Sequence, residues 1–524
     1  MSTSNANGRI DETACVWQLV ERRSRATADK VMLVDERDRS LTFAEFAQAA
    51  EQVAAGLLDL GVQPGSSVSW QLPTNLEAAV LMAALSRLGV VQNPILPVLR
   101  RKELGYILDT TSATTFIVPA SIKGFDHASM ARELADQRPI RTLILDGTFG
   151  GPFGLDLPAG DPAMLPPVDV EPAATRWLYF TSGTTAEPKG VRHSDPTILA
   201  TSNAMTLVGE VGEHDIVCAP VPFSHVGGMM MLVVSMRTGC QLVLIEAFDP
   251  LTTPGFAARH AATIIGAVPV MIPSLLSAQQ RHGAEPLFPS MRYVLSGAAA
   301  VPAALHAQVK EQLGGIGVTS PWGLTEAPQV TYPSLDGTDE QLAGTVGRAV
   351  PGVEVCVTDA DGNRCANGTV GELRVRGPQV FLGYVDPSLD ALAIDADGFL
   401  RTGDLGTIDD DGYVRITGRA KDVIIRNGEN ISAQEVEQTL LTHPAIAEAA
   451  AIGLPDARTG ERCCAVVVLA SGATEPSLTD VRSHFETAGV ARHKVPEQLV
   501  VVDGIPRNDM GKAQKQTIRQ LLME

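Results

Sequence analysis

The chain has 524 residues, more than one hydrophobic core usually organises, so several domains are expected. Apolar residues make up 45% and charged residues 19% of the sequence, which is typical of a soluble globular protein. The formal net charge of −19 argues against nucleic acid or an anionic membrane surface as the main partner.

The sequence gives no sign of export or membrane insertion. Its seven cysteines are scattered, without CxxC pairs or histidines at metal-ligand spacing, which indicates thiols in a reducing compartment. Residues 1–21 lack an apolar core and predict no signal peptide. The most apolar run, residues 229–236, is far below the ~20 residues that span a bilayer. We therefore expect a cytoplasmic protein, whose oligomeric state the sequence does not indicate.

Helices alternate with short apolar strands in the first part of the chain. Apolar side chains fall on one helical face over residues 43–58, and Gly61 stands at the usual C-terminal position. The pattern continues with strands at 67–71, 90–91, 115–118 and 142–145 and helices at 75–88, 102–109 and 130–136. This alternation predicts βαβ units and a mostly parallel sheet covered on both faces.

The pattern changes further along the chain. Residues 150–172 are rich in Gly and Pro and predict a connecting loop, after which a second α/β region runs to about residue 333. Beyond Gly344, short β runs separated by Asp-Gly turns predict a small, mainly antiparallel subdomain. A mixed pattern of predicted helices and strands returns from about residue 418 to the end.

A hydroxyl-rich loop, Thr-Ser-Gly-Thr-Thr-Ala-Glu-Pro-Lys-Gly, follows a predicted buried strand at residues 177–180. Hydroxyl donors, glycines that let backbone N–H groups approach an anion, and a lysine are what a triphosphate cradle needs. The loop lacks Walker spacing, and a polar surface turn is the alternative interpretation. The candidate phosphate-binding residues are Thr181, Ser182, Gly183, Thr184, Thr185 and Lys189.

At this loop the chain resembles the adenylate-forming superfamily, which includes acyl-CoA synthetases, aryl-CoA ligases, luciferases and peptide-synthetase adenylation domains. The loop departs from the family pattern at Ala186, where glycine is usual. The resemblance covers nearly the whole chain, and the motifs come in the family's order. It implies an α/β fold with a large N-terminal domain of parallel α/β subdomains plus a small β subdomain, residues 1–418. A small, mobile α+β C-terminal domain, residues 419–524, is expected to follow.

A Trp-Gly-Leu-Thr-Glu segment resembles the family's aromatic-Gly-x-Thr-Glu element. The resemblance implies that Trp322, beside Gly323, stacks on adenine and that Thr325 meets the α-phosphate. It also implies that Glu326 holds Mg²⁺, with Thr181 as a second metal ligand. Considered alone, Glu326 would more often be a solvated acid.

Two further segments resemble family elements that bind the nucleotide. The Thr-Gly-Asp segment assigns Asp404 to the ribose hydroxyls, and the Gly-Arg-Ala-Lys-Asp segment assigns Arg419 to the ribose or phosphate. Lys421 is then the hinge between the large and the small domain. An isolated Thr-Gly-Asp is usually only a turn, so the evidence is the correct spacing of both segments.

In the superfamily's first half-reaction a carboxylic acid and ATP form an acyl-AMP. The resemblance implies that Lys512, in a Pro-x-x-x-x-Gly-Lys loop near the C-terminus, is the main catalytic residue of this step. A carboxylate that attacks the α-phosphorus while pyrophosphate leaves needs its negative charge neutralised, and a lysine on a mobile loop supplies that charge. The Gly-Glu-Asn-Ile turn resembles the one that faces the active site of CoA ligases after domain rotation. Gly428 in this turn leaves room for pantetheine, which favours coenzyme A as the acceptor.

A Pro-Phe-Ser-His segment resembles the family element that borders the acyl pocket, and it places His225 there. No Asp occurs within residues 220–231, so a substrate ammonium would lack a partner and an amino acid is not expected. Residues 229–231, all Met, predict a pliable apolar wall or plain core. The small residues Gly297 and Ala298 leave room for a bulky acid. A medium-chain fatty, alicyclic or aromatic acid fits, and residues 191–193 most resemble fatty and cyclohexanecarboxylate CoA ligases.

The resemblance implies a ligase that uses ATP, Mg²⁺ and coenzyme A to make an acyl-AMP and then an acyl-CoA. Two alternatives remain open. The first is an acyl-AMP ligase that loads a carrier protein, and the second is an inactive nucleotide- or acyl-binding regulator. The second predicts loss of Lys512, Glu326 or Asp404, and all three are present.

Overall fold

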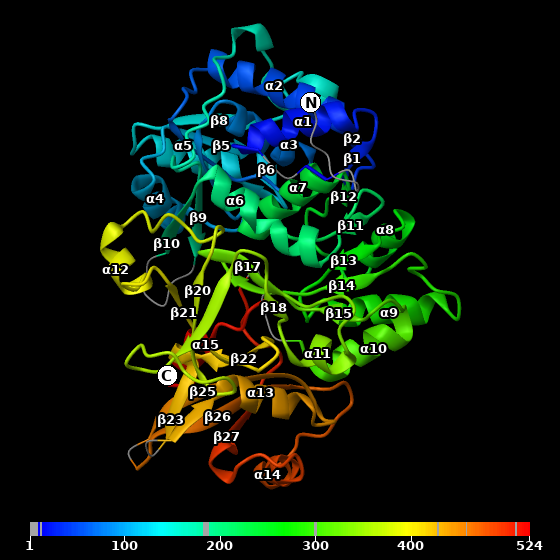
Figure 1. Cartoon of the computed structure of the whole chain (residues 1–524), viewed down its shortest axis with the longest axis vertical. Helices are drawn as coiled ribbons and strands as arrows, with labels where there is room; N and C mark the ends of the chain where they lie inside the picture. Colours follow the sequence, from blue (N-terminus) through cyan, green and yellow to red (C-terminus); the bar gives the residue numbers. More distant parts are fainter. Residues whose placement is uncertain are drawn as a thin grey trace.

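The computed structural model describes residues 9–10, 13–181, 188–297, 301–426, 429–456, 458–508 and 511–523 (Figure 1). The structure contains two α/β sheets, a β region and a C-terminal α+β unit, and the first two strands of the chain belong to the second sheet. None of the helices in this described part is both long and apolar enough to cross a bilayer.

The first sheet has six strands in the order β10-β9-β4-β3-β5-β8, and all neighbours are parallel except β9 and β10. Its strands are β3 (Ser67–Trp70), β4 (Val91–Pro94), β5 (Thr115–Pro119), β8 (Arg141–Leu145), β9 (Trp177–Thr181) and β10 (Lys189–His193). A short hairpin, β6 (Ser121–Ile122) and β7 (Phe125–Asp126), follows β5.

The second sheet has seven strands in the order β15-β14-β13-β11-β12-β1-β2, and only the β1–β2 pair is antiparallel. Its strands are β1 (Val31–Val34), β2 (Ser40–Thr42), β11 (Ile216–Cys218), β12 (Gln241–Val243), β13 (Ile264–Gly266), β14 (Tyr293–Leu295) and β15 (Val318–Thr319).

The largest apolar core lies between these two sheets, because it contains buried side chains from both of them and from several helices. Among these helices are α1 (Val16–Ala26), α2 (Phe43–Asp59), α3 (Leu76–Arg87) and α7 (Val226–Thr238). Helix α2 begins with a reciprocal capping box between Thr42 and Glu45.

Separate apolar clusters cover the outer face of each sheet, so both sheets are buried on two sides. The helices there are α4 (Arg101–Thr110) and α5 (His127–Ala135) on the first sheet, and α8 (Thr253–Arg259), α9 (Ile272–His282) and α10 (Ala303–Leu313) on the second. The remaining N-terminal helices are α6 (Asp195–Thr201), the π-turn Ala204–Val208 and α11 (Asp339–Gly344).

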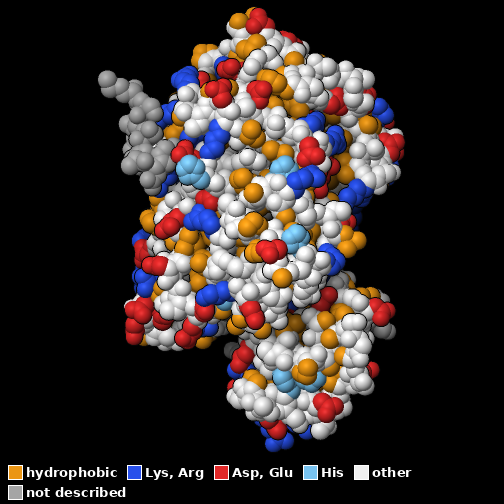
Figure 2. Space-filling model, turned by 90° about the vertical axis from the view of Figure 1, so that its right-hand side faces the viewer, with side chains coloured by type: hydrophobic (Ala, Val, Ile, Leu, Met, Phe, Trp, Pro, Cys, Tyr) orange, Lys and Arg blue, Asp and Glu red, His pale blue; other side chains and the backbone are white. Residues whose placement is uncertain are grey.

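An antiparallel β region and a C-terminal unit complete the chain. The β region contains β16 (Trp322–Leu324), β17 (Ala327–Tyr332), β18 (Arg348–Ala349), β19 (Glu354–Thr358), β20 (Gly371–Arg376), β21 (Leu400–Ile408), β22 (Val414–Arg419) and helix α12 (Asp390–Ala393). The C-terminal unit contains β23 (Val423–Arg426), β24 (Glu429–Ser432), β25 (Ile446–Asp456), β26 (Gly460–Leu469), β27 (Gln498–Val501), α13 (Ala433–Leu441), α14 (Leu478–Thr487) and α15 (Lys515–Leu521). Figure 2 shows the C-terminal unit as a smaller lobe below the rest of the molecule.

The fold class predicted from the sequence is confirmed, and most predicted elements lie within a few residues of those in the structure. Two details differ. The stretch 150–172 contains two single 3₁₀ turns, Pro152–Gly154 and Pro162–Met164, because a proline at each start favours helical φ. The strand predicted at 177–180 is one arm of a hairpin with β10, and both strands belong to the first sheet, although the sequence predicted a second α/β region after residue 172.

Candidate active site

The β9–β10 hairpin holds both ends of the hydroxyl-rich loop. Thr181, the last residue of β9, and Lys189, the first of β10, are opposite each other in the antiparallel register. The loop residues Ser182, Gly183, Thr184, Thr185 and Ala186 lie outside the described residues, so their contacts stay a prediction. The hairpin nevertheless fixes Lys189 beside the point where the loop begins.

Thr325 and Glu326 occupy the turn of the β16–β17 hairpin. Across this hairpin, a Cβ on Gly323 would lie 2.2 Å from the amide nitrogen of Gln329, so the close strand approach requires glycine. The Oε1 atom of Glu326 accepts a 2.8 Å hydrogen bond from the hydroxyl of Tyr384, which lies in the segment after β20. A distant segment therefore orients the carboxylate that the sequence assigns to Mg²⁺.

His193, the last residue of β10, supports the backbone of the same turn. Its Nε2 donates to the carbonyl oxygen of Thr325 at 2.8 Å, and its Nδ1 lies 3.0 Å from the hydroxyl of Thr197. Burial of the imidazole lowers the pKa of His193 to about 4. The ring is therefore neutral near pH 7, and the Thr325 carbonyl, which can only accept, fixes the proton on Nε2.

This buried imidazole predicts a loss of stability in mild acid. An unfolded histidine binds a proton below about pH 6.5, whereas His193 in the folded protein does so only near pH 4. The contribution of neutral His193 to the free energy of unfolding is complete above about pH 6.5. It is lost as the pH falls toward 4, and the loss is roughly 3 kcal/mol at most. We expect His193→Gln, which donates an amide N–H but does not titrate, to lose less unfolding free energy between pH 7 and 4.5. Equal losses in urea titrations of both proteins would contradict this role.

Trp322, Asp404 and Arg419 form a connected group beside this turn. The indole Nε1 of Trp322 donates to Oδ2 of Asp404 at 2.8 Å, and Nε of Arg419 lies 2.5 Å from Oδ1 of the same carboxylate. Trp322 and Asp404 are both buried, while Arg419 is partly exposed. The structure therefore brings together three residues that the sequence assigns to the nucleotide, and the indole N–H adds a contact to Asp404 that was not predicted.

The loop that carries Lys512 is docked against the second α/β region. The loop closes through hydrogen bonds between Asn508 and Lys512 and has Gly511 at φ +73°, a conformation that favours glycine. A Cβ on Gly511 would meet side-chain atoms of Val268 and Val270 at 3.5 Å. The C-terminal lobe thus delivers Lys512 to the segment that follows β13.

Four charged residues from other parts of the chain, Arg419, Asp404, Lys421 and Glu326, lie near the ammonium group of Lys512. Although Lys512 is exposed, the surrounding protein lowers the pKa of its ammonium, and the charge of Arg419 acts in the same direction. The carboxylates of Asp404 and Glu326 oppose this lowering. The structure therefore brings Lys512 close to acids that precede it by more than a hundred residues in the sequence.

Lys421 belongs to the same charged group. It lies in a 3₁₀ turn, Ala420–Asp422, between β22 and β23. Although Lys421 is exposed, desolvation by the surrounding protein lowers the pKa of its ammonium, and the charges of Arg419 and Lys189 act in the same direction, whereas Asp422 and Asp404 oppose it. The group therefore contains four cations, Lys189, Arg419, Lys421 and Lys512, and the carboxylates of Glu326, Asp404 and Asp422.

His225 and Gly297 are the two described residues that the sequence predicts at the acyl pocket. Nδ1 of His225 accepts a 3.1 Å hydrogen bond from the amide of Gly227 and caps α7, and burial together with the charge of Lys512 lowers the pKa of His225 to about 4. A Cβ on Gly297 would meet no atom of the described residues within 4 Å. Ala298, like Gly428 in the predicted pantetheine turn, lies outside the described residues.

The three methionines of residues 229–231 are at most 6% exposed, as expected of core. A cavity of about 10 Å³, lined partly by Phe223 and Met231, lies beside this core and has room for no more than one water. The wall beside His225 is therefore closely packed and apolar.

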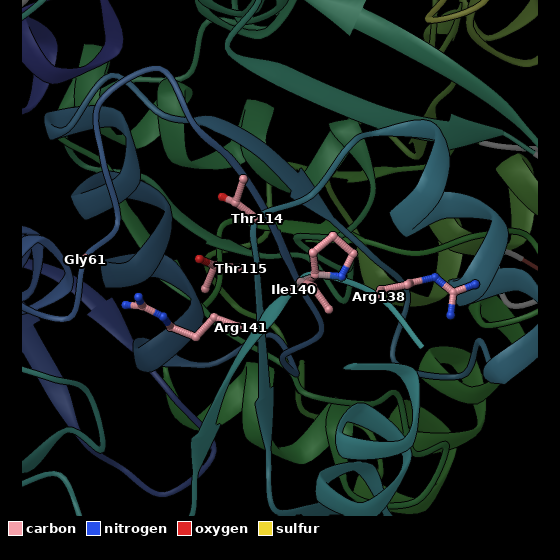
Figure 3. Close-up of a pocket in the computed structure, with 7 residues that line it drawn as sticks. Gly61, Thr114, Thr115, Arg138, Ile140 and Arg141 are labelled. Atoms are coloured by element: carbon pink, nitrogen blue, oxygen red, sulfur yellow. The ribbon is translucent and has the colours of Figure 1, made fainter. Parts of the chain in front are cut away.

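A larger hollow of about 340 Å³ lies far from these residues, at the start of β5 and β8 (Figure 3). Its two arginines do not converge: Arg141 extends toward Gly61, whereas Arg138 points the opposite way and pairs with Asp109 at 2.7 Å. Divergent guanidinium groups do not form a shared anion site, so this hollow does not compete with the charged group described above.

Comparisons with known proteins agree with this geometry. The family model for the AMP-binding enzyme matches residues 20–385, and the model for the AMP-binding enzyme C-terminal domain matches residues 435–512. The chain belongs to the AMP-binding enzyme family. The predicted resemblance to the adenylate-forming superfamily, in its acyl-CoA synthetase branch, is confirmed.

Relatives match over nearly their full length. The chain is 33% identical to the medium-chain fatty-acid–CoA ligase of Escherichia coli (strain K12), covering 97% of this chain and 90% of that protein. It is 35% identical to the salicyl-AMP ligase / salicyl-S-ArCP synthetase of Mycobacterium tuberculosis, covering 95% and 89%. The crystal structure of ATP-bound MatB from Rhodopseudomonas palustris superposes with a TM-score of 0.87 at 28% identity, covering 97% and 99%.

Tyr384 has no counterpart among the sequence predictions, and His193 appeared there only within residues 191–193, without a role of its own. Tyr384 and His193 lie 58 and 132 residues from the positions they contact, Glu326 and Thr325. Neither occurs in a pattern whose chemistry could be recognised locally. In the sequence, Tyr384 is only an aromatic residue and His193 only a histidine that follows an apolar segment.

Proposed function

We propose that this protein activates an apolar carboxylic acid with ATP, releases pyrophosphate, and transfers the acyl group from acyl-AMP to coenzyme A. The observation that carries the proposal is the convergence of four cations and three carboxylates, with more positive than negative groups, in a protein whose net charge is −19. Such local concentration of positive charge suits a triphosphate.

In the proposed first half-reaction, a carboxylate oxygen of the acid forms a bond to the α-phosphorus while the bond to the bridging oxygen of pyrophosphate breaks. The ammonium of Lys512 neutralises charge that develops at the reacting phosphate, and Thr325 donates to the α-phosphate. Asp404 and Arg419 bind the ribose side, with Trp322 and Gly323 beside the adenine. Lys189 and the hydroxyls from Thr181 to Thr185 bind the leaving phosphates.

The residues present fit a Mg²⁺ ion bound with the nucleotide. Within the described chain, Glu326 makes no ion pair with an arginine or lysine within 4.0 Å, and its orientation is set by a neutral phenol. A carboxylate of this kind and the hydroxyl of Thr181 suit Mg²⁺, which takes its other ligands from phosphate oxygens and water. The bound ion supplies positive charge to the phosphates as pyrophosphate leaves.

In the proposed second half-reaction, the thiol of coenzyme A attacks the acyl carbon, a thioester forms, and AMP leaves with the electron pair of the broken C–O bond. We assign residues 1–418 to the part that keeps the acyl-AMP and residues 419–524 to the part that moves. Lys421 is the proposed hinge, and Gly428 borders the proposed pantetheine path. The free thiols of all seven cysteines agree with a reducing, cytoplasmic location.

His225 and the wall beside it are uncharged and closely packed, so they favour a substrate acid that has no second charged group. His225 is uncharged near neutral pH because its pKa is about 4, and the methionine segment beside it is core. Burying a substrate ammonium or a second carboxylate there would be costly. A medium-chain fatty, alicyclic or aromatic acid is therefore the proposed substrate class.

A panel of such acids tests the proposal. The purified protein with Mg-ATP, coenzyme A and the preferred acid should give AMP, pyrophosphate and a thioester in equal amounts. An acyl-AMP that persists until a carrier protein is added would favour the alternative function, which the similarity to the salicyl-S-ArCP synthetase supports. Formation of ADP, or no acid-dependent nucleotide product with any acid, would contradict both.

A further inference from the structure

The segment that contains Tyr384 lies between two parts of the phosphate site. On one side, the amide of Phe381 donates to the carbonyl oxygen of Glu326 at 2.8 Å. On the other side, the amide of Val385 donates to the carbonyl oxygen of Gly190 at 2.8 Å, next to Lys189. The backbone of this segment therefore joins the β16–β17 turn to the end of the phosphate loop.

The side chain of Tyr384 contacts one charged group from each part. Its hydroxyl donates to Oε1 of Glu326 at 2.8 Å, and its ring lies 5.4 Å from the ammonium of Lys189, within the range of a cation–π contact. Phe381 packs edge-on against the same ring at 4.9 Å, and Tyr384 is only 6% exposed. A single rigid ring thus contacts both the carboxylate and the lysine.

The environment keeps the Tyr384 hydroxyl a donor. Its partner at 2.8 Å is a carboxylate oxygen, which accepts hydrogen bonds, so the phenol supplies the proton of this bond. A neutral donor to a carboxylate forms a short, charge-assisted hydrogen bond without cancelling the negative charge. Glu326 can therefore be held in one orientation while it remains fully available to a cation.

We propose that Tyr384 is a positioning residue that aligns Glu326 and Lys189 for binding of Mg-ATP. The inference rests on the proposed function and adds to it a residue outside the superfamily motifs named above. Loss of the hydroxyl frees the Glu326 carboxylate to rotate, whereas loss of the ring also removes the support beneath Lys189. The two functions of the side chain can be separated by substitution.

Calorimetric binding of Mg-ATP, without acid, is the first test. Tyr384→Phe keeps the ring and should raise the Mg²⁺ concentration needed for ATP binding by roughly tenfold or more. Tyr384→Leu should weaken ATP binding further. Tyr332→Phe is a matched control, because it removes another buried tyrosine hydroxyl, one bonded to Tyr293 at 3.4 Å, and should leave Mg²⁺ dependence unchanged.

A double-mutant cycle makes the test specific. In a Glu326→Gln background, Tyr384→Phe should have little further effect on Mg²⁺ dependence, since the carboxylate that it orients is gone. Thioester formation from supplied acyl-AMP should be the same in wild type and Tyr384→Phe. Unchanged Mg²⁺ dependence in Tyr384→Phe, additive effects in the cycle, or equal loss of both half-reactions would overturn the inference. Failure of the proposed function is recognised separately, because wild type would then bind Mg-ATP but form no acyl-AMP.

Discussion

Lys512→Ala is expected to slow acyl-AMP formation by on the order of 10²–10³-fold, because the variant lacks the ammonium that neutralises charge at the reacting phosphate. In the structure this ammonium lies among Arg419, Asp404 and Glu326, on a loop docked against Val268 and Val270. Acid-dependent exchange of labelled pyrophosphate into ATP measures the first half-reaction directly.

The second half-reaction provides the internal control for Lys512. Thioester formation from supplied acyl-AMP and coenzyme A should stay within a few-fold of wild type, because no phosphate is displaced from ATP in that step. Lys515→Ala is the matched lysine variant, since Lys515 lies three residues further on and pairs with Glu437 at 2.7 Å within the C-terminal lobe. Equal loss of both half-reactions in Lys512→Ala would contradict the proposed role.

The pH dependence of acyl-AMP formation should report the protonation state of Lys512. Desolvation by the surrounding protein and the charge of Arg419 lower the pKa of the Lys512 ammonium below its ordinary value of 10.5. Only the protonated form can neutralise the developing charge, so the rate of acyl-AMP formation should fall as the pH rises through this lowered pKa. Lys512→Ala should lose that alkaline limb.

Lys421→Pro is expected to impair thioester formation by on the order of 10²-fold while acyl-AMP formation changes much less. In the structure Lys512 lies near the carboxylates of Asp404 and Glu326, which suits the first half-reaction, and the proposed hinge at Lys421 would let the C-terminal lobe turn for the second. Proline fixes φ near −65° and restricts the residue before it, which limits rotation at this position. Single-turnover assays of the two half-reactions measure the difference.

Lys421→Ala separates the backbone effect from the charge. It removes the ammonium that lies near Arg419 and Lys189 but leaves the backbone free to rotate. If both variants lose thioester formation equally, the charge and not the hinge matters. If Lys421→Pro forms the thioester at the wild-type rate, the hinge role is excluded.

The predictable part of this site consists of residues in short local patterns. Glu326, Asp404, Arg419 and Lys512 each lie in a segment whose composition already suggests phosphate, ribose or metal chemistry, and the structure brings them together. Their order along the chain matched one superfamily, which supplied the tertiary arrangement that composition alone could not.

The unpredicted part depends on contacts between residues far apart in the sequence. The hydrogen bond from Trp322 to Asp404 spans 82 residues, and that from Tyr384 to Glu326 spans 58. The donors are aromatic side chains that ordinarily indicate only core packing. Which polar atom such a buried ring reaches is decided by packing of the whole fold, so no local pattern could reveal it.

Transfer of an oxygen atom tests the central claim most directly, because attack on the α-phosphorus leaves one oxygen of the acid on AMP. The purified protein, supplied with Mg-ATP, coenzyme A and an accepted acid labelled with ¹⁸O in its carboxylate, should yield AMP that carries one ¹⁸O per thioester formed. Label found in inorganic phosphate, or thioester formed together with unlabelled AMP, would contradict the account.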